Sequence, residues 1–506
     1  MTRVVTTLGL DGIRGSRVAA ECAIMGGLPA FDIVGLPDAS VREARERVRA
    51  AVKACGMKFP VSHITVNLAP ADTRKEGTIY DLPILLGILS ASEAIKPLPA
   101  DSAFIGELSL TGELRAIKGA LPMAAAAARE GIKRVYLPAA NAAEAAFAGG
   151  VEAIPIKDVS ELLACLAGEI VIAPAAAPDY RSTADSLPDF AEVKGHAVIK
   201  RALEVAAAGS HNVLMMGPPG SGKSMLAARL PSILPEMSRE EALEVTEIHS
   251  VAGITSEREP IISARPFRAP HHTISTAGLT GGGTNPRPGE ISLAHGGVLF
   301  LDEFPEFSRT AIEALRQPVE SGVVTISRAS GSSTFPSRFM LVAAMNPCRC
   351  GWYGTDNDKC RCSPADVRRY RSRVSGPLLD RIDVFLWVEA LSYEDLSRYG
   401  EGEPSAVIRA RVNAAREIQR RRFEGTGIRS NSEMDQAALR EYCALDDAGS
   451  ELMRRAYSAL DMSARAYDRT LRLARTIADL AGSEKIAVGH LAEAMSYRNQ
   501  KKGLEG

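Results

Sequence analysis

Residues 211–224 read HNVLMMGPPGSGKS, in which Gly-x-x-x-x-Gly-Lys-Ser follows an apolar run and precedes the helix-forming stretch MLAARL. This strand–loop–helix context predicts a phosphate-binding loop, because glycines let backbone N–H groups surround phosphates and a helix N-terminus adds partial positive charge. The alternative, a glycine-rich turn, is disfavoured because strand, spacing and helix agree. We expect nucleotide contacts from Gly217, Pro218, Pro219, Gly220, Ser221, Gly222, Lys223 and Ser224. Lys223 would reach the β- and γ-phosphates, and Ser224 would ligate Mg²⁺.

A second apolar run ends in two carboxylates. Residues 298–303 read VLFLDE, and four successive apolar residues are typical of a strand buried on both faces in a parallel sheet. Ligands of open α/β sheets bind at the carboxyl ends of such strands. We therefore expect Asp302 to position Mg²⁺ and Glu303 to polarise the attacking water, which predicts ATP hydrolysis rather than nucleotide binding alone.

A third apolar run, 340–345, ends at Asn346. An Asn at this strand end would orient the water or sense the γ-phosphate. The alternative is a turn-forming Asn before Pro347.

Four stretches carry a family resemblance: RPFRAPHHTIS (265–275), PGEISLAHGGVLFLDEFPEF (288–307), AMNPCRCG (344–351) and SGPLLDRID (375–383). The chain resembles the YifB/ComM family of magnesium-chelatase-like AAA+ ATPases over nearly its whole length. The resemblance implies a homo-hexameric ring that binds ATP and Mg²⁺ at subunit interfaces. For ComM-like members it further implies a DNA branch-migration helicase that aids integration of incoming DNA during natural transformation, with branched or single-stranded DNA as the partner.

Two arginines acquire roles from this resemblance. Arg381 in LLDRID stands where related ATPases carry the arginine finger that reaches a neighbouring subunit's γ-phosphate. The alternative is an ion pair with Asp380 or Asp383. Residues 463–480 resemble the lid helix with the second sensor arginine; Arg465 fits best, and Arg469 and Arg472 are alternatives.

Periodicity predicts only helices from residue 406 onward: 406–423, 433–442, 447–460, 464–481 and 487–498.

Composition is ordinary for a globular protein, with 46% hydrophobic and 24% charged residues, and the formal net charge is −1. No global basic field therefore indicates nucleic acid, although a ring can line its pore with local positive charge. Glu21 and two glycines interrupt the apolar run 19–31, which disfavours an export signal, and no stretch approaches a membrane span. We expect a cytoplasmic protein without a membrane partner.

Eight cysteines are too sparse for a disulfide framework. Four of them nevertheless cluster as C-x-C, nine residues, C-x-C, a set that could bind one Zn²⁺: Cys348, Cys350, Cys360 and Cys362. An unliganded surface loop is the alternative, because C-x-x-C is the commoner spacing. The isolated cysteines are expected to be small core residues: Cys22, Cys55, Cys165 and Cys443.

A linker rich in Ala, Pro and Ser, 173–188, divides the chain. Before it, strands at 31–35, 64–69, 103–108 and 134–137 alternate with helices at 38–55, 81–92 and 119–130, predicting an α/β domain. The segment 107–138 resembles the Lon proteolytic domain. Ile79 and Leu121 replace the expected Ser–Lys dyad, so we expect no protease activity, although a displaced dyad of Thr78 and Lys118 is conceivable.

The predicted architecture is thus a multidomain α/β protein. It comprises a Lon-protease-like α/β domain (1–172), the linker (173–188), an AAA+ core with a parallel sheet (189–400) and a helical lid (401–506). Gly195 and His196 precede a core helix expected to flank adenine.

DNA contacts are expected from basic residues of the core. An insert between Ile248 and Gly297 resembles a pore-entering segment of related rings; its polar features are Arg265, Arg268, His271 and His272. We assign the paired histidines a structural or pore-loop role rather than metal binding, because no third ligand has suitable spacing. Residues 323–339 predict a β-hairpin with Arg328 toward the pore, or an ordinary surface hairpin. Further candidates follow on 367–383, where a solvated helix face is the alternative: Arg368, Arg369, Arg371 and Arg373.

Two rival functions remain at this point. One is a chelatase-type motor that remodels a protein partner, which the Lon-like domain and the cysteine cluster disfavour. The other is an ATP-dependent protease, which the missing dyad disfavours.

Overall fold

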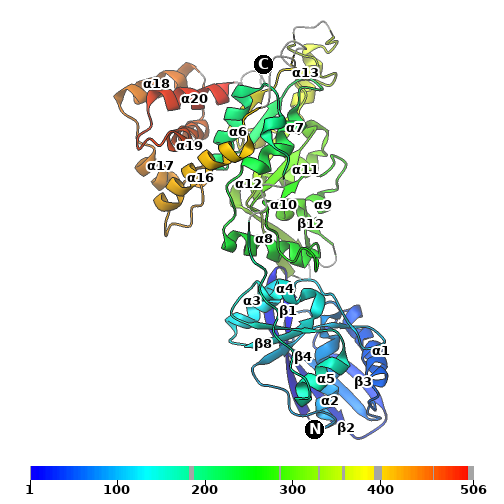
Figure 1. The fold of residues 1–506 in the computed structure, drawn as a ribbon. Coiled ribbons are helices and arrows are strands. Elements are labelled where there is room, and N and C mark those ends of the chain that lie inside the picture. Colours follow the sequence, from blue (N-terminus) through cyan, green and yellow to red (C-terminus); the bar gives the residue numbers. More distant parts are fainter. Residues whose placement is uncertain are drawn as a thin grey trace. The chain divides into compact units, whose positions relative to one another are not determined.

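The computed structural model describes residues 2–181, 187–283, 286–328, 331–355, 359–391, 402–459 and 461–499. Contacts divide the chain into two compact units, each with its own hydrophobic core (Figure 1). The first unit comprises residues 1–181 and two later segments, 239–262 and 325–335. The second comprises residues 182–238, 263–324 and 336–506.

The first unit contains a four-stranded sheet in the order β1-β2-β4-β3. Its strands are β1 (Thr2–Asp11), β2 (Arg14–Met25), β3 (Ala30–Val34) and β4 (His63–Ala69). β1 and β2 form a hairpin whose turn uses Gly12 at φ +61°, a conformation that glycine adopts without steric cost. Helix α2 (Asp81–Ala91) packs on β1 and β2, and every one of its residues is buried. This apolar helix is therefore the centre of the unit's core.

A second, parallel sheet completes the first unit. It orders β5 (Ser102–Phe104), β8 (Arg134–Pro138) and β9 (Glu152–Ile156), and a short pair consists of β6 (Glu107–Leu108) and β7 (Leu114–Arg115). The other helices are α1 (Ala39–Ala54), α3 (Ala120–Arg129), α4 (Ala139–Ala146) and α5 (Val159–Ala167). Asp38 and Asp158 cap α1 and α5 by accepting hydrogen bonds from the backbone N–H groups of Val41 and Glu161.

Helix α8 (Arg239–Ala252) belongs to this first unit, although its sequence lies beyond the phosphate loop. It packs on α3, and the Gly119 N–H donates to the Ser250 carbonyl at 3.1 Å. Buried Glu144 of α4 accepts hydrogen bonds from the Leu121 N–H and the Thr255 hydroxyl, each at 3.3 Å. Burial raises the pKa of Glu144. The segment 239–262 is thus held by polar contacts as well as by packing.

The second unit is built on a parallel sheet in the order β11-β14-β17-β10-β18. Its strands are β10 (Val213–Met216), β11 (Phe267–Arg268), β14 (Val298–Leu301), β17 (Met340–Met345) and β18 (Val384–Trp387). All residues of β10, β14 and β17 are buried, as expected for strands covered on both faces. The loops that follow β10, β14 and β17 therefore meet at one edge of the sheet.

Helices surround this sheet and form the C-terminal region. Around the sheet lie α6 (Ala197–Gly209), α7 (Lys223–Arg229), α9 (Thr276–Thr280), α10 (Glu290–Leu293), α11 (Arg309–Ala314), α12 (Arg316–Ser321), α13 (Pro364–Arg371) and α14 (Gly376–Leu379). The C-terminal helices are α16 (Ser405–Arg422), α17 (Gln436–Tyr442), α18 (Asp447–Ala459), α19 (Ala464–Leu480) and α20 (Val488–Asn499), grouped in Figure 1. Among the described helices, none has the length and apolar character needed to cross a bilayer.

Two short strand pairs complete the second half of the chain. They are β12 (Gly281–Gly282) with β13 (Arg287–Pro288), and β15 (Val323–Arg328) with β16 (Gly331–Pro336). The second pair confirms the predicted hairpin. Its segment 325–335 falls in the first unit, where Ser333 lies next to Gly12.

The expected helices and most of the expected strands of the N-terminal and C-terminal regions are found within a few residues of their predicted bounds, but the strand predicted at 103–108 is two strands, β5 and β6, in different sheets. The prediction was incomplete at the start of the chain, where it omitted β1 and β2. Alanine-rich β2 has weak intrinsic strand preference, and its pairing on both sides supplies the stabilisation. All of residues 182–186, within the predicted linker, lie outside the described part of the chain.

Candidate nucleotide-binding site

The predicted phosphate loop leaves the carboxyl end of β10 and ends where α7 begins. Gly222 precedes the helix with φ +89°, in the left-handed region that favours glycine. The Lys223 side chain turns back over the loop, and its Nζ donates to the carbonyls of Gly217 and Pro218 at 2.8 Å. Burial lowers the pKa of Lys223, and the charge of Asp302 partly offsets this effect. The loop therefore concentrates positive charge and N–H donors at one sheet edge.

Ser224 and Asp302 meet at this edge although they lie far apart in sequence. The Ser224 hydroxyl donates to Asp302 Oδ2 at 2.6 Å. Hard oxygen atoms of this kind are the ligands that Mg²⁺ prefers, so the pair fits the predicted metal position.

Glu303 follows Asp302 in a constrained conformation. Its φ is +51°, which is unusual for a residue with a side chain, and its N–H donates to Asp302 Oδ1 at 2.9 Å. Its carboxylate is exposed and lies 3.2 Å from Nδ1 of His272. Backbone strain at such a position is common in active sites. His272, predicted only as a structural or pore-loop residue, therefore contacts the expected catalytic carboxylate.

Asn346 ends β17 beside the phosphate loop. Its Oδ1 lies 3.3 Å from Lys223 Nζ, and its backbone makes a hydrogen bond with Tyr370. The structure thus brings the side chains of Lys223 and Asn346 together, as expected for a water-orienting or sensor residue. His196 precedes α6 with φ +55°, and its ring lies near Gly222 of the loop.

Arg381 lies at the opposite edge of the sheet from the phosphate loop. It precedes β18, whose Val384 pairs in parallel with Val213, the first residue of β10. Its carbonyl accepts a hydrogen bond from Asn212 Nδ2 at 3.0 Å. The four residues of β10 separate the two edges by about 13 Å. Arg381 therefore lies far from the nucleotide site of its own chain.

Arg381 forms an ion pair with a residue that the alternative interpretation, an ion pair with Asp380 or Asp383, did not name. Arg381 pairs with Glu320, whose side chain is 63% exposed, while Asp383 binds Arg469 at 2.6 Å. The hydrogen bond from Arg381 lowers the pKa of Glu320, and the charge of Arg465 adds to the effect. Glu320 thus lies near both Arg381 and Arg465.

Arg469 and Arg472, the alternative candidates for the second sensor arginine, bind groups inside the second unit. Arg469 donates to Asp383 and to the Arg381 carbonyl, and Arg472 donates to the Met434 carbonyl at 2.5 Å. Burial would raise the pKa of Asp383, but Arg469 and the nearby His211 ring hold it well below its usual range. Arg465 is exposed, which favours it over the other two as the sensor.

The four clustered cysteines converge at one point. Their Sγ atoms lie within 4.8 Å of one another, and three of the separations are 3.3, 3.7 and 3.9 Å. Tetrahedral Zn²⁺ with four thiolates requires separations of about 3.8 Å. Although burial opposes it, backbone hydrogen bonds from Trp352 and Arg361 help lower the pKa of Cys350 to about 6. The cluster fits a zinc site. Of the isolated cysteines, Cys22 and Cys443 are buried, whereas Cys55 and Cys165 are half-buried.

Two arginines that were predicted to contact DNA, Arg265 and Arg268, bind groups of this chain instead. Arg265 donates to the carbonyls of Pro235, Gly296 and Glu236, and Arg268 forms a bidentate ion pair with Glu290. These contacts engage the groups that a DNA phosphate would need.

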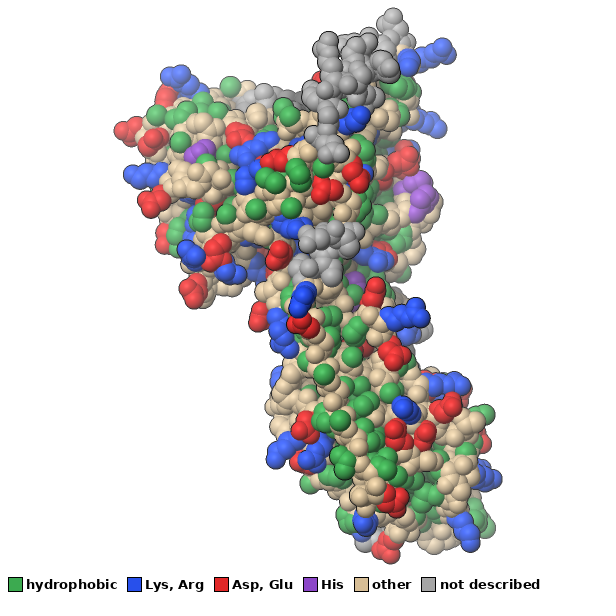
Figure 2. Space-filling model, viewed as in Figure 1, with side chains coloured by type: hydrophobic (Ala, Val, Ile, Leu, Met, Phe, Trp, Pro, Cys, Tyr) green, Lys and Arg blue, Asp and Glu red, His purple; other side chains and the backbone are tan. Residues whose placement is uncertain are grey.

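The four arginines on and just after helix α13 differ in their exposure and in their partners. Arg371 is buried and donates to the Pro347 carbonyl, which fits neither of the two interpretations left open for it, a DNA contact or a solvated helix face. Arg373 pairs with Glu306 at 2.8 Å. Arg368 and Arg369 are exposed, and the side chain of Arg328 lies outside the described part. Figure 2 shows positive and negative side chains interspersed over the face in view, in keeping with the net charge of −1.

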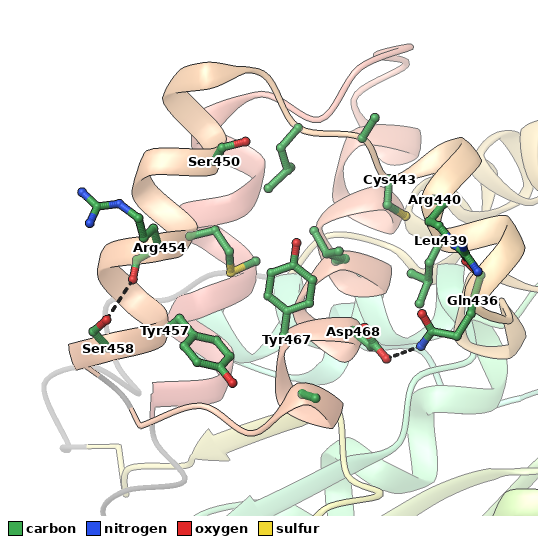
Figure 3. A pocket seen from close by; sticks show the side chains of 15 residues that line it. Gln436, Leu439, Arg440, Cys443, Ser450, Arg454, Tyr457, Ser458, Tyr467 and Asp468 are labelled. Carbon is green, nitrogen blue, oxygen red and sulfur yellow. Dashed lines mark hydrogen bonds between the residues drawn. The ribbon is translucent and has the colours of Figure 1, made fainter.

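A cavity of about 670 Å³ lies among α17, α18 and α19 (Figure 3). Tyr457 and Tyr467 line it with Met453, and Gln436 donates to Asp468 at 2.6 Å on its wall. Its lining residues belong to the C-terminal helices rather than to the phosphate loop. The cavity is therefore not the nucleotide site.

The first unit has apolar side chains where Lon-type enzymes need a dyad. Ile79 is 8% exposed and Leu121 is fully buried. The Thr78 hydroxyl donates to Glu107, and the Lys118 side chain packs against Gly253. Thr78 and Lys118 have different neighbours, which disfavours a displaced dyad.

Parallel sheet, phosphate loop and helical C-terminal region define an AAA+-like P-loop protein. Family models agree in three parts of the chain. Residues 189–396 match "Magnesium chelatase, subunit ChlI", 20–141 match "Subunit ChlI of Mg-chelatase" and 402–498 match "Magnesium chelatase, subunit ChlI C-terminal".

Relatives that match this protein over nearly the whole chain identify its family more closely. The competence protein ComM of Haemophilus influenzae is 42% identical over 502 residues, covering 98% of this chain and 97% of ComM. The uncharacterized protein YifB of Escherichia coli is 41% identical over 497 residues, 98% of this chain and 96% of YifB. The magnesium-chelatase 67 kDa subunit of Chlorobaculum parvum is 29% identical over only 31% of this chain and 23% of its own length. This chain belongs to the YifB/ComM family of magnesium-chelatase-like proteins.

Proposed function

We propose that this protein is a ring-forming, Mg²⁺-dependent ATPase that drives DNA branch migration as a helicase, in natural transformation or recombination in the cytoplasm. The ATPase part rests chiefly on one observation. Lys223, the Ser224–Asp302 pair, Glu303 and Asn346 come from three separate strands and meet at one sheet edge.

Each of these side chains has a defined task in hydrolysis. Lys223 would bind the phosphates, and Ser224 and Asp302 would hold Mg²⁺ through their oxygens. Bound Mg²⁺ would neutralise charge that develops on the phosphate oxygens. Glu303 accepts a proton from the attacking water, which Asn346 orients. His272 fixes the Glu303 carboxylate before the reaction.

The position of Arg381 supports the proposed ring. An arginine at the amino edge of the sheet cannot serve the phosphate loop of its own chain, but it can serve the loop of a neighbour. Arg465 and Arg381 both lie near Glu320, so both arginines would act across one subunit interface. Repeated head-to-tail contacts close into a ring, for which we propose six subunits.

The DNA part rests on family membership and on local charge. The relative ComM is named a competence protein, and exposed Arg368 and Arg369 supply positive charge on α13. ATPase assays without DNA and with single-stranded, double-stranded or four-way-junction DNA test this part. We expect branched or single-stranded DNA to stimulate hydrolysis. Equal rates in all four conditions would favour the rival, a chelatase-type motor for a protein partner, to which the short match to a magnesium-chelatase subunit points.

Replacing Arg368 and Arg369 together with Ala should weaken DNA binding and lower the steepness of its salt dependence by about 2, because each phosphate contact releases about one counterion. The measurement is DNA affinity by fluorescence anisotropy from low to moderate salt. Arg420→Ala with Arg421→Ala is the matched control, because both exposed arginines pair with Glu417. Identical salt slopes in both double variants would exclude α13 from the DNA contact.

We also propose that the first unit has a Lon-like fold without protease activity. The inert pair Ile79 and Leu121 supports this proposal. Digestion of casein by the purified protein in the presence of ATP would contradict it and favour the protease rival.

We propose one further cofactor, a zinc ion on Cys348, Cys350, Cys360 and Cys362. Protein purified without chelators should contain about one Zn²⁺ per chain, and Cys360→Ser with Cys362→Ser should release it, because structural sites need four ligands. Elemental analysis measures the metal content. Cys22→Ser with Cys165→Ser is the control, since neither residue belongs to the cluster. Absence of zinc from the wild-type protein would reject the site.

A further inference from the structure

The loop that carries the four clustered cysteines (348–362, here the cysteine loop) touches the phosphate loop at Gly351. Gly351 follows Cys350 and has φ +87°. A Cβ atom at Gly351 would lie 2.6 Å from both Cγ and Cδ of Pro219 in the phosphate loop. Such a distance is well inside van der Waals contact, so the backbone of the cysteine loop lies directly against the Pro219 ring.

One end of the cysteine loop is anchored beside the nucleotide site, and the other end is anchored at α13. Cys348 lies two residues after Asn346, which contacts Lys223. The intervening Pro347 accepts a buried hydrogen bond from Arg371 of α13 at 3.1 Å. At the other end, Ser363 follows Cys362 directly and caps α13 by accepting from the Asp366 N–H at 3.2 Å. A metal that ties the four cysteines together would therefore fix a segment between the nucleotide site and α13.

We propose that the metal-bound cysteine loop braces the phosphate loop through the Gly351–Pro219 contact, so that zinc occupancy controls nucleotide affinity. This inference rests on the proposed zinc and nucleotide sites. Four thiolate ligands hold Gly351 at a fixed distance from the strand end, and Gly351 in turn limits the positions open to Pro219. Loss of the metal leaves the cysteine loop free to move. Pro219 of the phosphate loop then loses its contact with Gly351.

Two glycine variants of the cysteine loop separate the effect of the Gly351–Pro219 contact from the backbone strain of replacing a glycine at positive φ. Gly354 lies in the same loop with φ +77°, but among the described residues a Cβ there would meet only the Trp387 ring, at an ordinary 3.6 Å. Gly351→Ala should retain about one zinc per chain and weaken binding of a fluorescent ATP analogue about tenfold, because overpacking displaces Pro219. Gly354→Ala suffers the same backbone strain and should bind the analogue within about threefold of wild type.

A double variant checks that the Pro219 ring transmits the effect. Pro219→Ala removes the two atoms that the Gly351→Ala methyl would strike. Gly351→Ala should therefore cost less affinity in the Pro219→Ala background than in the wild-type background. Equal losses in both backgrounds, in proteins that melt like wild type, would overturn the contact as the route.

Zinc removal provides the second arm. Dialysis of the wild-type protein against a chelator should weaken nucleotide binding about tenfold, and Zn²⁺ addition should restore it, with far-UV circular dichroism to show that the fold persists. A folded, zinc-free protein that binds the analogue like the zinc-loaded one would overturn the brace while leaving the nucleotide site intact. A wild-type protein that binds no nucleotide would instead overturn the proposed function.

Discussion

Glu303→Gln should retain ATP binding and lower turnover about 10²- to 10⁴-fold, the usual contribution of a general base. Gln keeps the shape of the side chain but cannot accept the proton of the attacking water. The contact with Nδ1 of His272 at 3.2 Å and the strained backbone at φ +51° hold the carboxylate in one position, so a neighbouring acid is a poor substitute. Phosphate release and equilibrium binding of an ATP analogue, measured on the same preparation, separate catalysis from affinity.

Lys223→Ala is the control, because it should stop hydrolysis for a different reason. Lys223 Nζ donates to the loop carbonyls of Gly217 and Pro218, where it is positioned for phosphate. Its removal should weaken nucleotide binding about 10- to 100-fold, as expected for a hydrogen bond to a charged group. Turnover by Glu303→Gln near the wild-type rate would exclude Glu303 as the base.

Arg381→Ala should keep nucleotide affinity within a few-fold of wild type and lower hydrolysis about 10³- to 10⁵-fold, as for other arginine fingers. The prediction follows from the sheet, since Arg381 precedes β18 whereas the phosphate loop follows β10. Glu320, its exposed partner, holds the guanidinium near the surface. Glu320→Ala serves as the control: if the ion pair were the only role of Arg381, both variants would lose the same activity.

Much of the nucleotide site could be predicted because its motifs are local. The phosphate loop, Asp302, Glu303 and Asn346 each end or follow a short apolar strand, and parallel strands carry such ends to the same edge. The cysteine cluster was also predictable, because its four thiols lie within a short segment. Helices with strong periodicity, such as 464–481, were predicted to within one residue.

Contacts between distant residues were not predictable from local patterns. The His272–Glu303 pair, the Arg381–Glu320 pair and the Gly351–Pro219 contact each depend on how separate strands order themselves in the sheet. One signal was available for His272, because polar residues shortly after a strand of a parallel sheet lie at the ligand edge.

The grouping of residues 239–262 with the first unit shows a further limit of sequence analysis. Its helix α8 follows the phosphate loop in sequence and carries an ordinary amphipathic pattern. The partners of Ser250 and Thr255, namely Gly119 and Glu144, show which core it joins. Periodicity gives the apolar face of a helix but not the surface that covers it.

Mixing Arg381→Ala with Lys223→Ala subunits tests whether each ATPase site is completed by a neighbouring subunit. Each variant alone should be inactive. In mixed rings an intact phosphate loop from one variant meets an intact Arg381 from the other at about a quarter of the interfaces, since head-to-tail contacts place unlike surfaces together. Phosphate release in the mixture, with DNA present if rings assemble on DNA, should therefore recover to a measurable fraction of wild type. A mixture as inactive as its components, with subunit exchange shown independently by fluorescence energy transfer, would show that Arg381 does not act across the subunit interface.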